Sequence, residues 1–110
     1  MIRTSYFAKY KGENGVSIAV GTPKWFKGRK YEPLCPPWDL VEKVKYDGNT
    51  EYYTREYYRR VLSKLDPEKV MADLEYEAVF LCWEKSGEFC HRHIVAEWLH
   101  DELGTIVVEI

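Results

Sequence analysis

The sequence predicts an α/β fold: a single small domain over residues 1–110, Rossmann-like, with a mostly parallel sheet of about four strands and flanking helices. Three observations predict it. Short β-branched and aromatic runs alternate with stretches of helical periodicity. The apolar run "AVFLCW" at 78–83 is typical of a central strand covered on both faces. Strand, helix and strand signals follow one another at the C-terminus, and the strands of such a unit are parallel.

The first half of the chain is expected to hold two strands and a long loop. Residues 2–8 and 16–20 are rich in β-branched and apolar residues, and each run ends at turn formers. Residues 24–37 contain three prolines and a glycine, so this stretch is expected to lack regular structure. Long ordered loops in small domains are often functional. This loop is therefore the first region of interest.

Helical signals fill most of the second half. Pro37 suits the first turn of a short helix. Thr50 is predicted to cap a helix that runs to about residue 65, on an apolar stripe with i+4 spacing (Tyr53, Tyr57, Val61 and Leu65). Asp66 and Pro67 predict a capped restart over residues 66–74. Residues 94–103 carry the last amphipathic stripe, which ends at Gly104, and residues 105–110 read as a closing strand.

Composition excludes several classes of protein. Apolar residues make up 45% of the chain, charged residues 31% and aromatic residues 15%, which argues against disorder, collagen and coiled coil. No apolar run approaches the roughly 18 residues of a membrane span, and the first residues lack the apolar stretch of a secretion signal. A cytoplasmic protein without a membrane partner is expected. Its three cysteines are accordingly expected to be thiols.

The formal net charge of −2 conceals an asymmetry. Residues 1–46 carry nine Lys or Arg and four acids, a net charge of +5, whereas the remaining residues carry seven and fourteen, a net charge of −7. Such a split is consistent with an anion site in the first half of the chain. It is equally consistent with two solvated surfaces that attract each other.

A cluster of reactive side chains follows the predicted central strand. A loop delivers Cys90, His91, Arg92 and His93 to the first turn of a helix. First-turn N–H groups lack intrahelical partners and favour an anion, and a guanidinium adds donors that match phosphate. A cysteine in such a place is expected to be reactive as a thiolate. The sequence therefore predicts Cys90, His91 and Arg92 as catalytic residues and His93 as a ligand contact; the alternative is that Cys90 packs under the helix start.

The spacing of these residues argues against two more specific kinds of site, a phosphatase loop and a metal site. A tyrosine-phosphatase loop needs Arg six residues after its Cys, and this chain has an alanine there. A structural zinc site needs four ligands, and no second close pair accompanies Cys90 and His93. His93 shares a helix face with Glu97 and His100, which is a weak metal signal. Cys82, inside an apolar strand, is expected to be a small core residue. No metal site is therefore predicted.

The loop over residues 24–31 offers a second set of contacts. Lys24, Lys27 and Arg29 are interleaved with Trp25 and further aromatic residues. Nucleobases stack on aromatic side chains while cations hold phosphates. Lys24, Trp25, Lys27 and Arg29 are therefore predicted to bind ligand, as a lid over the helix start or as a nucleic-acid contact. The alternative is that the aromatic residues anchor the loop to the core and the cations keep it solvated.

Three stretches resemble one family. "FLCWEKSGEFCHRHIVAEWL" at 80–99 is similar to the C-terminal signature of the family called domain of unknown function 488, in which a strand ending in Leu-Cys precedes an acidic residue, Cys-His-Arg and a helix. "VSIAVGTPKWFKGRKYEPLCPPWDLV" at 16–41 resembles its second strand and Pro-Lys-Trp loop, Pro23, Lys24 and Trp25 here. "YYTREYYRRVLSKLDPEKVMADLE" at 52–75 resembles its Tyr-x-x-x-Tyr helix.

The resemblance spans nearly the whole chain and implies a compact α/β domain with its site around Cys90, His91 and Arg92. It implies no particular reaction. The family often has Ser-Arg after the second strand, where this chain has Ala19, Val20 and Gly21, so any part of a family site that depends on that Arg is in doubt.

Two functions are therefore expected. The first is a small enzyme-like domain that binds a phosphate-bearing or nucleotide-like ligand at the helix start around Cys90, His91 and Arg92. The second is a non-enzymatic module that binds nucleic acid or a nucleotide through the basic and aromatic loop over residues 24–31. The sequence assigns no cofactor.

Overall fold

A parallel sheet of five strands organises the chain in the computed structural model, which describes residues 2–75 and 77–110. The strand order is β3-β2-β4-β1-β5, and each neighbouring pair is parallel. The strands are β1 (Arg3–Tyr6), β2 (Gly15–Ser17), β3 (Arg29–Lys30), β4 (Val79–Cys82) and β5 (Val108–Glu109). The predicted α/β class is confirmed, and the sheet has one strand more than expected.

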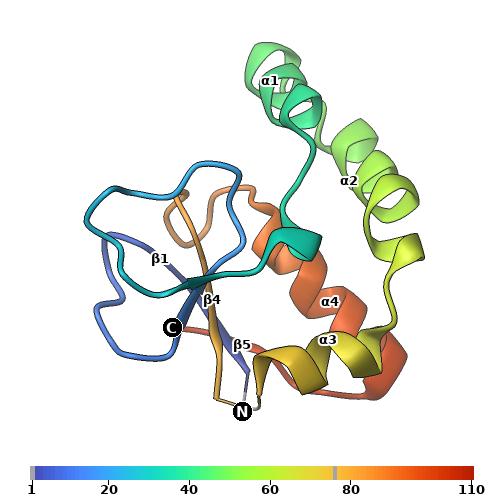
Figure 1. Ribbon diagram of the computed structural model, residues 1–110. Coiled ribbons are helices and arrows are strands. Elements are labelled where there is room, and N and C mark those ends of the chain that lie inside the picture. Colours follow the sequence, from blue (N-terminus) through green and yellow to red (C-terminus); the bar gives the residue numbers. More distant parts are fainter. Residues whose placement is uncertain (1, 76) are drawn as a thin grey trace.

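In the described residues, four α-helices and two short 3₁₀ turns lie between β3 and β5. They are η1 (Glu32–Leu34), α1 (Trp38–Asp47), α2 (Thr50–Arg60), η2 (Leu62–Lys64), α3 (Pro67–Leu74) and α4 (His91–Leu103). α4 packs on β1 and β4, α2 and α3 contact α4, and α1 contacts α2. Figure 1 shows the helices on one side of β1 and β4, and the loops after β1 and β2 on the other. None of the helices in the described residues has the length and apolar character that crossing a bilayer needs.

β4 is the central strand, as its apolar run predicts. All four of its residues are buried, and it pairs with β1 on one side and β2 on the other. Its last residue, Cys82, lies opposite Tyr6 of β1. β5 pairs with β1, so the crossover through α4 passes over one strand. The two strands of this predicted unit are therefore in one parallel sheet without being neighbours.

Side-chain caps begin two of the helices. Asp66 accepts a hydrogen bond from the Glu68 N–H at 3.0 Å and caps α3, as predicted. α2 is capped by Asn49, whose side chain accepts from the Tyr52 N–H at 3.0 Å, and Thr50 is already inside the helix. The predicted cap was therefore one residue too late, because Asn and Thr are both good caps and stand side by side here.

The loop over residues 24–37 holds more regular structure than expected. It contains β3 and η1. The signal for β3 was missing because this edge strand has two residues, both basic and exposed. Gly28 lets β3 approach β2, since a Cβ on Gly28 would lie 2.7 Å from the Gly15 carbonyl oxygen.

Candidate functional site

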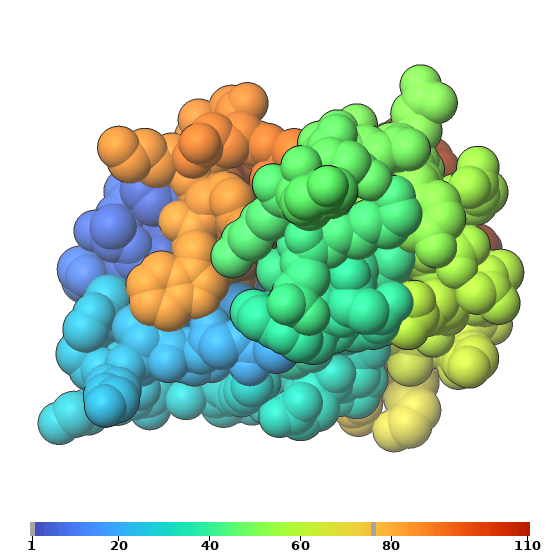
Figure 2. All heavy atoms as spheres, turned by 90° about the horizontal axis from the view of Figure 1, so that it is seen from above, coloured from blue at the N-terminus to red at the C-terminus, as the bar shows by residue number. Residues whose placement is uncertain are grey.

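A cavity of about 470 Å³ opens at the carboxyl edge of the sheet; we call it the carboxyl-edge cavity. Its walls are the segment after β2, one face of α1, and the chain from the end of β4 to the start of α4. Figure 2 looks onto this edge, where the orange segment after β4 faces the green atoms of α1. In open α/β sheets ligands bind outside the carboxyl ends of the strands. The cavity is therefore where the fold class predicts a ligand.

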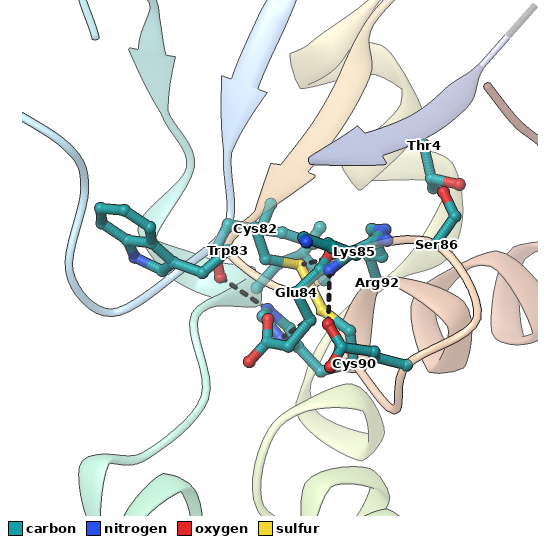
Figure 3. The surroundings of a disulfide bond; sticks show 12 residues. Thr4, Cys82, Trp83, Glu84, Lys85, Ser86, Cys90 and Arg92 are labelled. Atoms are coloured by element: carbon teal, nitrogen blue, oxygen red, sulfur yellow. Dashed lines mark hydrogen bonds between the residues drawn. A yellow bond between two sulfur atoms is a disulfide. The ribbon is translucent and has the colours of Figure 1, made fainter. Parts of the chain in front are cut away.

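A pair of sulfur atoms borders this cavity. Cys82 at the end of β4 and Cys90 at the N-cap of α4 are joined in a disulfide bond (Figure 3). Both residues are buried, and both line the cavity. The prediction of three thiols is wrong for this pair and holds for Cys35, which is free. The pairing arises because the strand end and the helix start flank one short loop, with a sequence separation of 8. The expectation of thiols rested on the expected cytoplasmic location, which does not take this closeness into account.

His91 connects the sulfur pair to β2. Its Nε2 lies 2.6 Å from the Ile18 carbonyl oxygen, and its Nδ1 lies 3.8 Å from Cys90 Sγ. A carbonyl oxygen only accepts hydrogen bonds, so Nε2 carries the proton and the Nδ1 lone pair faces the sulfur. Burial lowers the pKa of His91 to about 4, with Arg92 adding to the shift and the Ile18 bond opposing it. The imidazole is therefore neutral at pH 7.

Arg92 has protein partners for its guanidinium. It is fully buried and donates from Nε and Nη2 to the Glu109 carboxylate, and from Nη1 to the Glu84 carbonyl at 2.8 Å. Nη1 also lies 3.6 Å from Cys82 Sγ. Figure 3 shows Arg92 beside the sulfur pair. Arg92, which was predicted to hold an anionic group of the ligand, is thus already paired with Glu109. It is also not among the described residues that line the cavity.

The carboxylate of Glu109 is held ionised by this arrangement. Burial alone raises its pKa, but hydrogen bonds from Arg92, Ser86 and Thr4 outweigh burial and lower the pKa of Glu109 to about 2. The Ser86 and Thr4 hydroxyls both donate at 2.5 Å. Glu109 therefore ties β5, β1 and the loop after β4 to Arg92, and Arg92 fixes the start of α4.

The predicted basic loop lies outside this cavity. Lys27 and Arg29 line a separate cavity of about 430 Å³ at the amino edge of the sheet. Trp25 and Lys27 line a third, of about 390 Å³. Lys24 is exposed and His93 is half-buried, and neither lines any of these three cavities. Of the eight predicted site residues, the structure brings Cys90 and His91 together at the carboxyl-edge cavity.

Several lining residues went unpredicted. Trp38 and Trp83 are 54% and 55% exposed, Phe89 is 38% exposed, and Lys45 and Glu84 add one charge of each sign. Trp83 and Glu84 directly follow the predicted central strand, so the rule that ligands bind at carboxyl strand ends could have found them. Trp38 and Lys45 lie on α1, and nothing in their local sequence marks them as site residues.

Fold and site together define a class: a small α/β domain with a buried sulfur and imidazole cluster at the carboxyl edge of its sheet. The chain matches no protein-family model, no curated protein and no solved structure. Membership of the family called domain of unknown function 488 stays a prediction, and a function is inferred from the geometry.

Proposed function

We propose that the chain is an enzyme-like domain that binds a nucleotide-like ligand, meaning a flat ring carrying an anionic group, in the carboxyl-edge cavity. Reduced Cys90 contacts the reacting group of the ligand, and His91 takes the thiol proton. The observation that carries the proposal is the orientation of His91: its bond to Ile18 directs the Nδ1 lone pair at Cys90 Sγ on the cavity wall. A thiol with an oriented neighbouring base is an activated nucleophile.

Aromatic side chains support the ring part of the proposal. Trp38 and Trp83 expose more than half of their surface and both line the cavity. Trp83 is held in place by its indole N–H, which donates to the Gly21 carbonyl at 2.6 Å, and by the Phe7 ring with 5.3 Å between centroids. A fixed aromatic face loses little entropy when a flat ring stacks on it.

Two features support the proposal that the ligand carries an anionic group. Lys45 supplies a cation on the α1 wall. α4 begins at the cavity, its N-cap Cys90 makes no side-chain capping bond, and the first N–H groups of a helix lack intrahelical acceptors. Glu84 lines the same cavity, so its carboxylate offers an acceptor to an amino group on the ring of the ligand. The cavity thus matches a ligand with both an anionic and an N–H-bearing end.

Reduction precedes reaction at Cys90. A dithiol reductant gives two electrons and two protons to the Cys82–Cys90 bond, which becomes two thiols while the reductant becomes a disulfide. The Cys90 S–H proton then passes to His91 Nδ1, which leaves a thiolate on the cavity wall beside a protonated imidazole.

A ligand panel tests the proposal on reduced Cys35→Ser protein, in which Cys82 and Cys90 carry the remaining thiols. Thermal shifts are measured with nucleotides, nucleosides, sugar phosphates and inorganic phosphate. We expect a nucleotide to stabilise the fold, by about 2.7 kcal/mol at 100 times its Kd, and to slow alkylation of Cys90. Trp38→Ala should weaken its binding about tenfold, which corresponds to the loss of one stacked ring.

Trp25→Ala is the matched control, since Trp25 is 52% exposed and lies outside this cavity. Absence of binding by every nucleotide, or an equal loss in both tryptophan variants, contradicts the proposal. Oligonucleotide binding that weakens in Trp25→Ala and falls steeply with salt would instead favour the module that acts through the loop over residues 24–31.

A further inference from the structure

Three potential metal ligands converge at the wall of the carboxyl-edge cavity. The sulfur atoms of Cys82 and Cys90 and a ring nitrogen of His91 all lie within 4.8 Å of one another. The three residues are 1%, 3% and 5% exposed. They come from the end of the central strand and the start of α4, so the packing of the sheet and of α4 on it fixes their relative positions. Once the disulfide is reduced, these three atoms are near enough to one another to share one ion.

The Nδ1 atom of His91 has a lone pair that accepts a hydrogen bond, and the neighbouring disulfide has no proton to donate to it. Its Nε2–H is taken by the Ile18 carbonyl, which leaves Nδ1 as an acceptor. The atom found next to Nδ1 among the described residues is Cys90 Sγ, and a disulfide sulfur carries no proton to donate. Buried acceptors normally have a partner, and reduction of the disulfide offers Nδ1 two new ones: the Cys90 thiol, or a metal ion held by the sulfur atoms. A metal-binding histidine almost always donates its other ring N–H to a carboxylate, a backbone carbonyl or water, and the Ile18 carbonyl is such a partner.

Arg92 supplies the surroundings that thiolate ligands need. Its Nη1 lies 3.6 Å from Cys82 Sγ, so the guanidinium places an N–H donor and a positive charge beside that sulfur. The Glu109 carboxylate and the Glu84 carbonyl hold Arg92 in this position. Hydrogen bonds to ligand sulfur atoms tune a metal site and are part of its construction. Arg92 is therefore a positioning residue here, not a ligand.

The backbone spacing of the two cysteines also fits shared ligation. Their Cα atoms are 7.5 Å apart. Two Zn–S bonds of about 2.3 Å at a tetrahedral angle place the sulfur atoms about 3.8 Å apart, and the wide Cα separation accommodates that distance.

We propose that the reduced protein binds one Zn²⁺ or a similar borderline divalent ion through Cys82 Sγ, Cys90 Sγ and His91 Nδ1, with the fourth position open to the carboxyl-edge cavity. Two thiolates and one imidazole form a soft set that suits zinc and its analogue cobalt, not magnesium or calcium. Three protein ligands with one open position are typical of catalytic zinc, whereas structural zinc has four. The two thiolates neutralise the charge of the ion.

This inference deepens the proposed function and rests on the same cavity, but it changes the role of Cys90 from nucleophile to ligand. A phosphine reductant opens the disulfide: the phosphine becomes a phosphine oxide with oxygen from water, and Cys82 and Cys90 become thiols. Binding of the ion then releases the two thiol protons, and no further electrons move.

The experiment titrates Co²⁺ and Zn²⁺ into phosphine-reduced Cys35→Ser protein. We expect one ion per chain by native mass spectrometry, together with the near-ultraviolet thiolate-to-cobalt band and the visible bands of tetrahedral cobalt. Cys82→Ser, Cys90→Ser and His91→Gln should each weaken Co²⁺ binding at least tenfold. His100→Gln, an exposed change on the same helix, should not. Circular dichroism identifies any variant that fails to fold.

A second readout needs no further substitution. Zn²⁺ should slow alkylation of both Cys82 and Cys90 in the reduced Cys35→Ser protein. Reduced protein that binds no more Co²⁺ than Cys82→Ser, or whose alkylation is unaffected by Zn²⁺, overturns the inference. The nucleotide panel is run with and without Zn²⁺: nucleotide binding without Zn²⁺ binding refutes the metal site and leaves the proposed function, and the reverse result refutes the proposed function and leaves the metal site.

Discussion

Arg92 and Glu109 join the first turn of α4 to β5 through two parallel hydrogen bonds, Nε to Oε1 at 3.1 Å and Nη2 to Oε2 at 2.9 Å. Such paired bonds fix both distance and orientation. The Arg92 side chain is fully buried, whereas that of Glu109 is 25% exposed. The edge strand therefore anchors the helix start from which Cys90 and His91 reach the cavity.

Removal of Arg92 should destabilise the fold strongly. Arg92→Ala leaves Glu109 without its cation and the Glu84 carbonyl without a donor, and breaking a buried ion pair costs about 3 kcal/mol or more. We expect a corresponding fall in the free energy of unfolding in urea. Arg59→Ala, which breaks a surface pair on α2, is the control and should leave the midpoint nearly unchanged. Equal effects of the two substitutions would show that the buried pair does not anchor α4.

Stability should fall in acid through Glu109. Burial raises the pKa of this carboxyl, but the bonds from Arg92, Ser86 and Thr4 lower it to about 2, below the usual 4.5. A carboxyl whose pKa is lower in the folded state binds its proton first in the unfolded chain. Its contribution is therefore complete above about pH 4.5 and is lost as the pH falls toward 2.

The measurement is the free energy of unfolding across that range in the wild type and in Glu109→Gln. We expect the variant to be less stable at pH 7 and to lose less stability between pH 4.5 and 2. Glu97→Gln, an exposed change on α4, is the control and should follow the wild type. Parallel pH curves for Glu109→Gln and the wild type would contradict this account.

Tyr57 should contribute through its hydroxyl as well as its ring. The O–H donates to the Leu34 carbonyl at 2.6 Å in the buried interior, which ties α2 to η1. Tyr57→Phe keeps the ring and leaves that carbonyl without its donor, at a cost of about 1–2 kcal/mol. Thermal and urea unfolding measure the loss, with Tyr46→Phe, at a 92% exposed position, as the control. If Tyr57→Phe leaves the stability unchanged, the Leu34 carbonyl must accept a hydrogen bond from another donor.

The helix caps give a local test. Asn49→Ala removes the side chain that accepts from Tyr52 N–H at the start of α2, and it should lower stability by about 1 kcal/mol. Thr50→Ala changes the next residue, which lies inside the helix and makes no cap, so it should have little effect. The two variants are compared by urea unfolding and by the far-ultraviolet signal of the helices. A larger loss of stability in Thr50→Ala than in Asn49→Ala would show that Thr50 is the cap, as the sequence predicts.

Sequence reasoning could reach the fold class because burial leaves periodic patterns. The continuous run of β4 and the Asp66 cap are local signals, and both are confirmed. The structural role of Arg92, which is to pair with Glu109, could not be predicted from the sequence, because an arginine at a helix start is also typical of an anion site. Its partner Glu109 stands 17 residues away on a two-residue edge strand.

The carboxyl-edge cavity was missed in part for the same reason. Cys90 and His91 stand in a recognisable cluster, whereas Trp38 reaches the site only because α1 packs beside it. Such a contact depends on the tertiary arrangement. Conversely, Lys24, Lys27 and Arg29 stand close together in the sequence, yet in the structure Lys27 and Arg29 line the amino-edge cavity, whereas Lys24 lines none of the three cavities.

The bond between Cys82 and Cys90 turns the loop between β4 and α4 into a cyclic peptide. Trp83, Glu84 and Phe89 lie inside that ring and form one wall of the cavity. A closed ring has fewer conformations than an open loop, so the oxidised chain presents this wall preformed, whereas the reduced chain must order it when a ligand binds. An ion held by both thiolates would close the same ring again, through metal in place of the sulfur bond.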